Sequence, residues 1–322
     1  MANSNSRPDE FSLIAELFAP LSGDGAFGLT DDAAVIAPSP GCELVITTDA
    51  ILEGTDFFPD DPADTVAKKA LRVNLSDLAA KGARPRAYLL TLALPDKIGM
   101  DWLKEFATGL KQDQEEFGIT LLGGDMSATP GPLLISVTAF GEVPTGKMIR
   151  RSGARYGDGV FVTGTIGDSG GGLSLLKREF ATGSDDLVRR YRVPLPRAPF
   201  GWQILGLANA ALDVSDGLIA DARHLAEVSG VHLFLEAEQI PLSSSLRAVW
   251  GADAVLRAAG SGDDYEILFT ASPQSETEIR ALAEKTSTPV TRIGSVKAGT
   301  GVTLLDAQGR EIQVLQAGYR HF

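Results

Sequence analysis

The stretch Glu43-Leu44-Val45-Ile46-Thr47-Thr48-Asp49 joins a short apolar run to two hydroxyls and a carboxylate. Pro40-Gly41 precedes it, and aliphatic residues fill its centre, a pattern that predicts a buried strand. We expect the strand to stop at the polar residues, because open α/β sheets place their sites at strand ends. Hydroxyl and carboxylate oxygens are ligands that Mg2+ prefers. The alternative is that these residues only cap the strand and open a turn.

Length and composition restrict the class of protein. The 322 residues, 44% of them hydrophobic, suffice for two domains with an ordinary core. The single cysteine, Cys42, excludes an intramolecular disulfide and a thiolate metal cage. Residues 1–10 are polar, and no apolar run approaches the roughly 18 residues of a membrane span, so we expect a cytoplasmic protein without a membrane partner. A net charge of −13 argues against a nucleic-acid partner.

An acid beside an apolar run recurs along the chain. Asp31 and Asp32 follow a Gly-rich loop and precede 33–36, which reads as a strand. Adjacent side chains on an extended segment point to opposite faces, so one of the pair lines a given site, and Asp32 is favoured. Two solvated turn aspartates are the alternative.

A long helix over 61–81 places two polar groups on its inner side. Asp61-Pro62 supplies an N-cap and a first-turn proline. At 100° per residue, Asn74 falls inside the apolar stripe and Asp77 lies on its edge. Burying a neutral polar group without a partner costs about 2 to 7 kcal/mol, and a charge costs more. A metal, a ligand or a neighbouring loop must therefore satisfy Asp77.

The rest of the first half completes a layered α/β unit. Strands are expected over 88–94, 119–122 and 133–143, and a second helix over 102–117. Gly123-Gly124-Asp125 closes the strand at 119–122, and its glycines allow a ligand to approach the backbone closely.

The segment Gly141–Met148 nearly matches the phosphate-binding motif GxxxxGK[ST]. Met148 stands where the motif needs a hydroxyl, and Pro144 removes a backbone N–H. We therefore predict an ordinary turn, with a domain boundary near residue 148 at the start of a basic loop.

The second half has acids at two further junctions. Asp213-Val-Ser215-Asp216-Gly217 lies between an apolar run and a helix from Leu218. Ser215 and Asp216 could be simple helix caps, whereas Asp213 is not needed for a cap. In 261–269, paired acids stand at the start of a strand. A Gly-rich turn over 164–172 is a weak phosphate-site signal, because GxGxxG spacing is missing.

Six motifs together resemble those of the thiamine-monophosphate kinase family, which belongs to the superfamily of aminoimidazole ribonucleotide synthetase and selenophosphate synthetase. They are Thr30-Asp-Asp32, Thr47-Thr-Asp49-Ala-Ile-Leu-Glu-Gly54, Asn74-Leu-Ser-Asp77-Leu-Ala-Ala-Lys-Gly82, Gly123-Gly-Asp125, Asp213-Val-Ser-Asp216-Gly217 and Ser261-Gly-Asp-Asp264-Tyr-Glu266. The resemblance implies a two-domain α/β (α+β) fold. Residues 1–148 would form an ATP- and Mg2+-binding domain whose sheet makes a homodimer interface, and residues 149–322 a C-terminal α/β domain.

The resemblance also implies site residues. Those that look like magnesium ligands are Asp32, Thr47, Thr48, Asp49, Asp77, Asp125, Asp213 and Asp216. Those that look like ATP contacts are Gly124, Asp125, Arg151 and Ser215, and the substrate side falls to Asp56, Asp263 and Gln316. Three positions depart from the family's commonest pattern: Thr30 replaces a glycine, Asp56 a histidine, and Gln316 stands near the place of a tryptophan. These departures bear on recognition of the substrate's rings and leave the metal set intact.

The implied activity is ATP-dependent phosphorylation of thiamine monophosphate to thiamine diphosphate, assisted by several Mg2+ ions. The attacking phosphate oxygen is already anionic at pH 7, so direct in-line transfer needs no general base or protein nucleophile. Another ATP-using synthetase of the superfamily is the nearest alternative, and a non-catalytic nucleotide- or metal-binding regulator is another. A selenophosphate synthetase is less favoured because no Cys-Lys pair occurs near the N-terminus. A hydrogenase-maturation enzyme would need a C-terminal cysteine, and the chain ends in Tyr319-Arg-His-Phe322.

Overall fold

The computed structural model describes residues 8–314 and Gly318. The chain forms two compact units. The first comprises Met1–Leu78 and Arg84–Gly146, and the second comprises Ala79–Ala83 and Lys147–Phe322. Each unit is a mixed α/β structure with its own sheet, as the sequence predicts.

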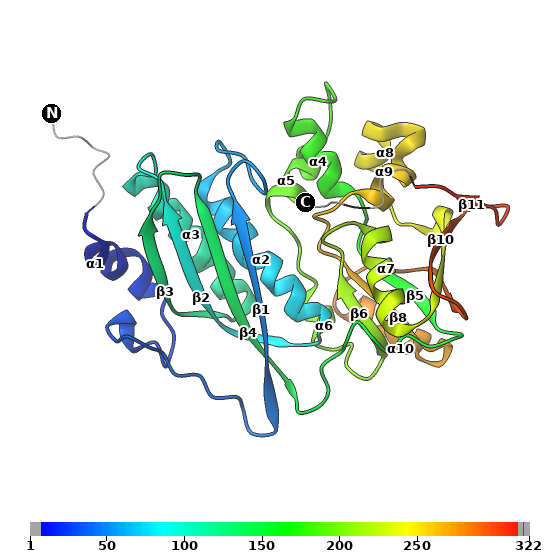
Figure 1. Ribbon diagram of the computed structural model, residues 1–322, viewed down its shortest axis with the longest axis horizontal. Coiled ribbons are helices and arrows are strands. Elements are labelled where there is room, and N and C mark those ends of the chain that lie inside the picture. The colour runs from blue at the N-terminus through cyan, green and yellow to red at the C-terminus, as the bar shows by residue number, and fades with distance from the viewer. Residues whose placement is uncertain (1–7, 315–317, 319–322) are drawn as a thin grey trace. The chain divides into compact units, whose positions relative to one another are not determined.

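The first unit is built on a four-stranded sheet, in the order β1-β4-β2-β3. Its strands are β1 (Cys42–Leu52), β2 (Arg84–Leu94), β3 (Thr120–Ala128) and β4 (Leu134–Pro144). Its helical segments are α1 (Glu10–Leu13), η1 (Ile14–Phe18), η2 (Ala19–Leu21), η3 (Phe27–Leu29), α2 (Ala63–Ala80, whose last two residues belong to the second unit) and α3 (Met100–Phe117). β2 and β3 are parallel, and the other pairs are antiparallel. Helices α2 and α3 cover one face of this sheet (Figure 1).

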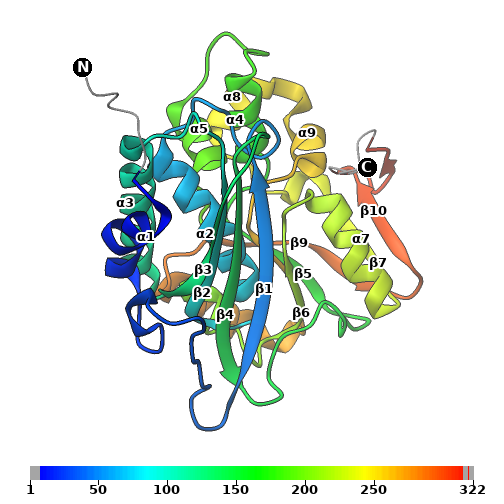
Figure 2. The same cartoon turned by 60° about the vertical axis from the view of Figure 1, so that its left-hand side comes forward.

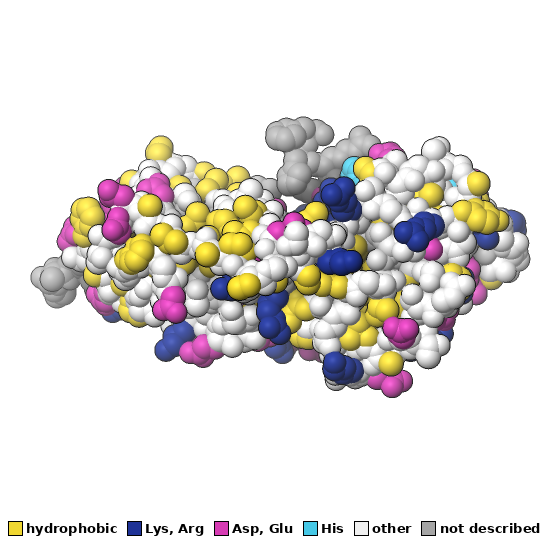
Figure 3. All heavy atoms as spheres, turned by 90° about the horizontal axis from the view of Figure 1, so that it is seen from below, with side chains coloured by type: hydrophobic (Ala, Val, Ile, Leu, Met, Phe, Trp, Pro, Cys, Tyr) yellow, Lys and Arg dark blue, Asp and Glu magenta, His cyan; other side chains and the backbone are white. Residues whose placement is uncertain are grey.

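The burial of β4 shows how the sequence builds this layer. Ile135, Val137 and Ala139 are buried against the helices, and the intervening Ser136 and Thr138 are half-buried on the other face. This alternation follows from the two-residue period of a strand. Neither α2 nor α3 covers the other face in Figure 2, where the segment before β1 packs against Ala87, Leu89 and Leu122, and exposed hydrophobic side chains are visible on this unit in Figure 3. On that open face, Ile46 of β1 is 60% exposed.

Three sequence expectations about strand ends are wrong. β1 continues to Leu52, so Thr47–Asp49 lies inside the strand, and β3 continues to Ala128, so Asp125 is also internal. Residues 33–36 form no strand. For the two longer strands the reason is tertiary pairing: β1 pairs with β4 and β3 pairs with β2 beyond the apolar residues, and the ladder hydrogen bonds outweigh the change to polar side chains.

The second unit contains a seven-stranded mixed sheet, in the order β11-β10-β7-β9-β5-β8-β6. Its strands are β5 (Gly159–Thr163), β6 (Ala208–Asp213), β7 (His232–Glu236), β8 (Ile267–Ala271), β9 (Val290–Lys297), β10 (Gly301–Leu305) and β11 (Glu311–Ile312). Its helices are α4 (Asp168–Leu176), α5 (Asp185–Arg192), α6 (Ala198–Gly201), α7 (Leu218–Ser229), α8 (Ser244–Trp250), α9 (Ala254–Gly260) and α10 (Glu276–Lys285), with short 3-10 turns η4 (Ala237–Gln239), η5 (Gly251–Asp253) and η6 (Pro273–Ser275).

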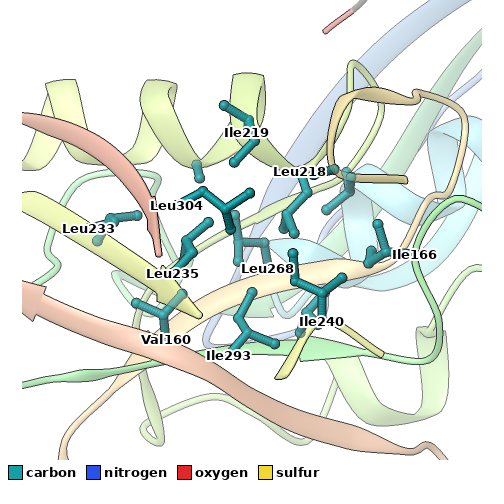
Figure 4. Packing of buried hydrophobic residues seen from close by; sticks show 14 of the residues in the cluster. Val160, Ile166, Leu218, Ile219, Leu233, Leu235, Ile240, Leu268, Ile293 and Leu304 are labelled. Atoms are coloured by element: carbon teal, nitrogen blue, oxygen red, sulfur yellow. The ribbon is translucent and has the colours of Figure 1, made fainter. Parts of the chain in front are cut away.

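The core of the second unit lies between this sheet and α7. Figure 4 shows Leu218 and Ile219 of α7 over Val160 and Leu268 of the sheet. Alternate residues of the same strands point the other way, where the rings of Phe161 and Phe269 stack with centroids 5.3 Å apart. Full burial of such side chains stabilises the fold by about 1.5–3 kcal/mol each, so the sheet is a rigid base for the loops at its edge.

The near match to a phosphate-binding loop has no loop geometry. Residues 141–144 belong to β4, and no helix begins between Thr145 and Asp158. This agrees with the interpretation of the segment as coincidental, because the motif requires a loop that enters a helix. Over the part of the chain that the structure describes, no helix is long and apolar enough to cross a membrane.

Candidate functional site

Three of the predicted residues meet on the helix-covered side of the first sheet. Thr47 and Asp49 are two residues apart on β1 and therefore share a face. The Thr47 hydroxyl donates a hydrogen bond to Asp77 Oδ2 on α2. Asp77 is half-buried, as expected for a polar group at the edge of an apolar stripe.

The electrostatics of this group would favour a bound cation. Burial, reinforced by the carboxylates of Asp77 and Asp56, raises the pKa of Asp49 to about 6. No Lys or Arg is among the causes of this shift. Two crowded carboxylates and a hydroxyl offer the hard oxygen donors that Mg2+ prefers, and a bound cation would remove the repulsion between them. The residues present therefore fit a divalent cation.

Asp56 has a structural role that the sequence did not reveal. Its Oδ2 accepts a hydrogen bond from the backbone N–H of Leu52 at 2.8 Å. Lys69, which is 1% exposed, donates from Nζ to the carbonyl of Asp56 at 2.7 Å. The carboxylate thus shapes the turn after β1 and also acts electrostatically on Asp49.

Thr48, Gly124 and Asp125 are placed differently within the first unit. The Thr48 hydroxyl contacts Val137 O at 3.1 Å and the Thr138 hydroxyl at 3.0 Å, on the open face of the sheet. Asp125 is paired with Thr91, both are exposed, and paired residues share a face. At Gly124, an added Cβ would lie 1.7 Å from the carbonyl oxygen of Leu90, so only glycine fits. Within this unit, the predicted metal set is therefore divided between two faces of one sheet.

Asp32 lies in the irregular segment before β1. Its side chain is exposed and makes no hydrogen bond or ion pair with another described residue, while its backbone N–H donates to Asp31 Oδ1 at 2.8 Å. This is the geometry of a solvated turn aspartate, which was the alternative to a ligand role. Gln316 lies outside the described residues.

The second unit holds three of its predicted residues, Ser215, Asp216 and Asp263, on two paired loops. The N–H of Asp263 donates to Ser215 O at 2.8 Å, and the N–H of Tyr265 donates to Val214 O at 2.8 Å. Asp263 and Tyr265 both have positive φ, 66° and 52°. Such a conformation costs on the order of 1–3 kcal/mol per residue and persists only where the surroundings impose it. Ser215, Asp216 and Asp263 are thereby brought together, and Asp213 is 6% exposed at the end of β6.

Two buried acids hold these loops in place through hydrogen bonds and ion pairs. Asp264 Oδ2 accepts from the N–H of Gly167 at 2.7 Å, and burial raises the pKa of Asp264 well above its ordinary value. Glu266 accepts from Arg197 Nε at 2.6 Å and from Arg190 Nη2 at 2.9 Å. Burial alone would raise the pKa of Glu266, but the two guanidinium groups and a threonine hydroxyl hold it below its ordinary value.

A third acid, Asp221, was missed by the sequence reading. Helix α7 begins after Gly217 with no side-chain cap, so the alternative that Ser215 and Asp216 are simple helix caps is wrong. Instead, Asp221 Oδ2 accepts from the backbone N–H groups of Asp216 and Gly217 at 3.0 and 3.1 Å. Burial and the Asp216 carboxylate raise the pKa of Asp221 to about 7, against the opposing charge of Arg151. Its position in the sequence is a signal of burial like that of Asp77, because Asp221 follows Leu218 by three residues on the buried side of α7.

In residues 8–314 and Gly318, no three His, Cys, Asp or Glu side chains are already gathered as a metal centre. Each unit by itself holds hydroxyl and carboxylate groups among its predicted residues: Thr47, Asp49 and Asp77 in the first, and Asp213, Ser215 and Asp216 in the second. Both units therefore present the same two kinds of oxygen donor, hydroxyl and carboxylate.

Two family models match the chain. The model described as AIR synthase related protein, N-terminal domain, matches residues 30–143, and the corresponding C-terminal domain model matches residues 155–306. Structures of a hydrogenase maturation protein share the fold at a TM-score of 0.78 with 20% identity. The fold and the paired loops therefore define an AIR synthase related protein.

Relatives with higher identity are more specific. The thiamine-monophosphate kinase of Caulobacter vibrioides is 40% identical over 98% of this chain and 91% of its own, and that of Escherichia coli K12 is 37% identical over 97% and 98%. The crystal structure of thiamine-monophosphate kinase from Stenotrophomonas maltophilia has a TM-score of 0.83 at 38% identity, covering 91% of this chain and 94% of that one. AaThiL complexed with AMPPCP and TMP has a TM-score of 0.79 at 32% identity, covering 98% and 100%. The chain therefore belongs to the thiamine-monophosphate kinase family.

Proposed function

We propose that this chain transfers the γ-phosphoryl group of ATP to the phosphate of thiamine monophosphate. The bond between the γ-phosphorus and its bridging oxygen breaks, a bond from that phosphorus to a phosphate oxygen of thiamine monophosphate forms, and ADP and thiamine diphosphate leave. The related AaThiL structure, complexed with AMPPCP and TMP, supports both substrates. The reaction would supply thiamine diphosphate in thiamine biosynthesis.

The observation that carries the proposal is the carboxylate group around Asp49. Burial and the carboxylates of Asp77 and Asp56 raise the pKa of Asp49 to about 6, so ionising this group at neutral pH costs free energy that a bound cation would offset. Mg2+ bound there would screen the repulsion between a triphosphate and a monophosphate, which is the main barrier to their reaction. Thr47 and Asp77 hold the group in place from β1 and α2.

The second unit would supply the nucleotide and substrate contacts. Arg151 and Ser215 would be ATP contacts of this unit, and Gly124 and Asp125 would be ATP contacts of the first unit. Asp213 and Asp216 would add metal ligands, and Asp263 would contact thiamine monophosphate. The backbone hydrogen bond between Asp263 and Ser215 supports this division, because it fixes a substrate contact beside a nucleotide contact.

We further propose that the chain acts as a homodimer with domains 1–148 and 149–322. The open face of the first sheet, with Ile46 60% exposed, is a surface that a second copy could cover. Thr48 and Asp125 project from this face and would then lie at or near the dimer interface.

Release of ADP from Mg-ATP, with and without thiamine monophosphate, tests the function. We expect ADP release to require thiamine monophosphate and to vanish with EDTA. Equal ADP release in the absence of thiamine monophosphate would indicate a different acceptor, and no release under any condition would favour a non-catalytic nucleotide-binding protein.

A further inference from the structure

The turn that carries Ser215 and Asp216 needs a hydrogen-bond acceptor from outside the turn, which we call its brace. Gly217, which ends the turn, has φ 116° and ψ 148°, and an added Cβ would lie 3.0 Å from the carbonyl oxygen of Ser261. No side chain of the turn caps helix α7. The backbone N–H groups of Asp216 and Gly217 therefore need an acceptor from elsewhere, because unsatisfied buried N–H groups are costly.

Asp221 supplies that acceptor from the first turn of α7. One carboxylate oxygen, Oδ2, receives both N–H groups, at 3.0 and 3.1 Å. The helix around it is anchored, because Leu218 and Ile219 point into the core (Figure 4) and Asp221 itself is 5% exposed. A single fixed oxygen thus sets the orientation of two successive peptide planes.

The braced turn lies beside other candidate groups. The Asp216 carboxylate and the Arg151 guanidinium both act electrostatically on Asp221. On its other side, the turn accepts a hydrogen bond at Ser215 O from the N–H of Asp263. A shift of the turn would therefore displace Ser215 and Asp216 directly.

We propose that Asp221 is a positioning residue for Mg-ATP binding, acting through hydrogen-bond acceptance by Oδ2 and not through its charge or as a metal ligand. This inference rests on the proposed function for the roles of Ser215 and Asp216. The proposal predicts different results for two substitutions. In Asp221→Asn the amide oxygen can still accept hydrogen bonds from both N–H groups, whereas Asp221→Ala leaves them without this acceptor.

The test compares these variants in the full chain by calorimetric titration with Mg-AMPPCP and by kinetics. We expect Asp221→Ala to weaken Mg-AMPPCP binding and raise the KM for Mg-ATP about tenfold, as for loss of hydrogen bonds of ordinary strength. Asp221→Asn should stay within about threefold of the original chain, since the acceptor remains. The matched control is Asp306→Ala, because Asp306 Oδ1 likewise accepts two backbone N–H groups, at 2.9 Å each, in the turn after β10. It should lower thermal stability without changing nucleotide binding.

Two outcomes would overturn the proposal. If Asp221→Asn loses binding by tenfold or more, the charge of Asp221 is what matters, and this result holds even if Asp221→Ala fails to fold. If Asp221→Ala folds and changes only the unfolding temperature, as Asp306→Ala does, the brace serves stability alone. Failure of the proposed function would look different: thiamine monophosphate would not stimulate ADP release, although Mg-AMPPCP still bound with the expected order among the variants.

Discussion

The two units carry their candidate residues on different kinds of backbone. In the first, Thr47, Asp49 and Asp77 project from the interior of a strand and a helix, whose positions are fixed by pairing and packing. In the second, Ser215 and Asp263 lie on loops with positive-φ residues, held by backbone hydrogen bonds and buried acids. In the first unit, removing the charge of a candidate residue should therefore leave the fold intact. In the second unit, the positions of the candidate residues should depend on the hydrogen bonds and buried acids that hold the loops.

Asp49→Asn should give the largest effect on turnover. The amide keeps the shape but removes a negative charge from the group that would hold Mg2+, so we expect kcat to fall on the order of a hundredfold or more. Without metal, the thermal stability should hold or rise, because the repulsion with Asp77 is relieved. Steady-state kinetics over a range of Mg2+ concentrations, with the exposed Asp101→Asn as control, measure this. Near-normal turnover at limiting Mg2+ would remove Asp49 from the metal site.

Glu266→Gln should have its main effect on stability. It leaves Arg190 and Arg197 with an uncharged partner in a buried site, so we expect the free energy of unfolding to fall by about 3 kcal/mol. Denaturant unfolding gives this value. The control is Glu276→Gln, because the Glu276–Arg280 pair is on the surface and should change stability by less than about 1 kcal/mol. Equal losses of unfolding free energy in both variants would show that the buried pairs stabilise the fold no more than the surface pair does.

The pH dependence of stability should distinguish Asp49 from an ordinary surface acid. The pKa of Asp49 is raised to about 6 in the folded protein, so the folded state binds a proton more tightly than the unfolded state does. Its favourable contribution is complete below pH 4 and is lost as the pH rises through about 6. In EDTA, the stability of Asp49→Asn relative to the original chain should therefore grow by about 2 kcal/mol between pH 4 and 7. If the stability difference between the two proteins stayed constant across that range, the raised pKa of Asp49 would be contradicted. Saturating Mg2+ should abolish the pH dependence of this difference.

Substitutions at Asp56 should have a moderate effect that depends on the replacement. Asp56→Ala loses the hydrogen bond from Leu52 N–H, and we expect it to raise the KM for thiamine monophosphate several-fold, about 1 kcal/mol, and more than the KM for Mg-ATP. Asp56→Asn keeps an acceptor and should restore much of the loss. Parallel measurement of both KM values checks this, and equal changes would assign Asp56 to the metal site.

Lys147→Ala should have the smallest effect. The segment before it belongs to β4 and cannot form a phosphate-binding loop, so activity should change by no more than about twofold, as for a surface position. A loss comparable with that of Asp49→Asn would mean that ATP binds at this segment, against the family assignment.

Sequence reasoning succeeded where periodicity decides the structure. The two helices that cover the first sheet, the inward Asp77 and the left-handed Gly118 after α3 followed from spacing and cap signals alone. It failed at strand ends, because the ladder between β1 and β4 extends through Thr47–Asp49 regardless of polarity. The spacing of α7 indicates that Asp221 is buried, but no local pattern specified the turn that bends back onto its carboxylate.

The most direct test of the account is to follow the transferred phosphate by phosphorus NMR in a mixture of the protein, Mg-ATP and thiamine monophosphate. In the proposed reaction, charge screening and positioning suffice, so no protein nucleophile takes part. We therefore expect the β-phosphate signal of thiamine diphosphate to grow in step with ADP, one for one, and γ-labelled ATP to leave no label on the protein. Label on the protein during turnover, or ADP formed with free phosphate in place of thiamine diphosphate, would contradict it.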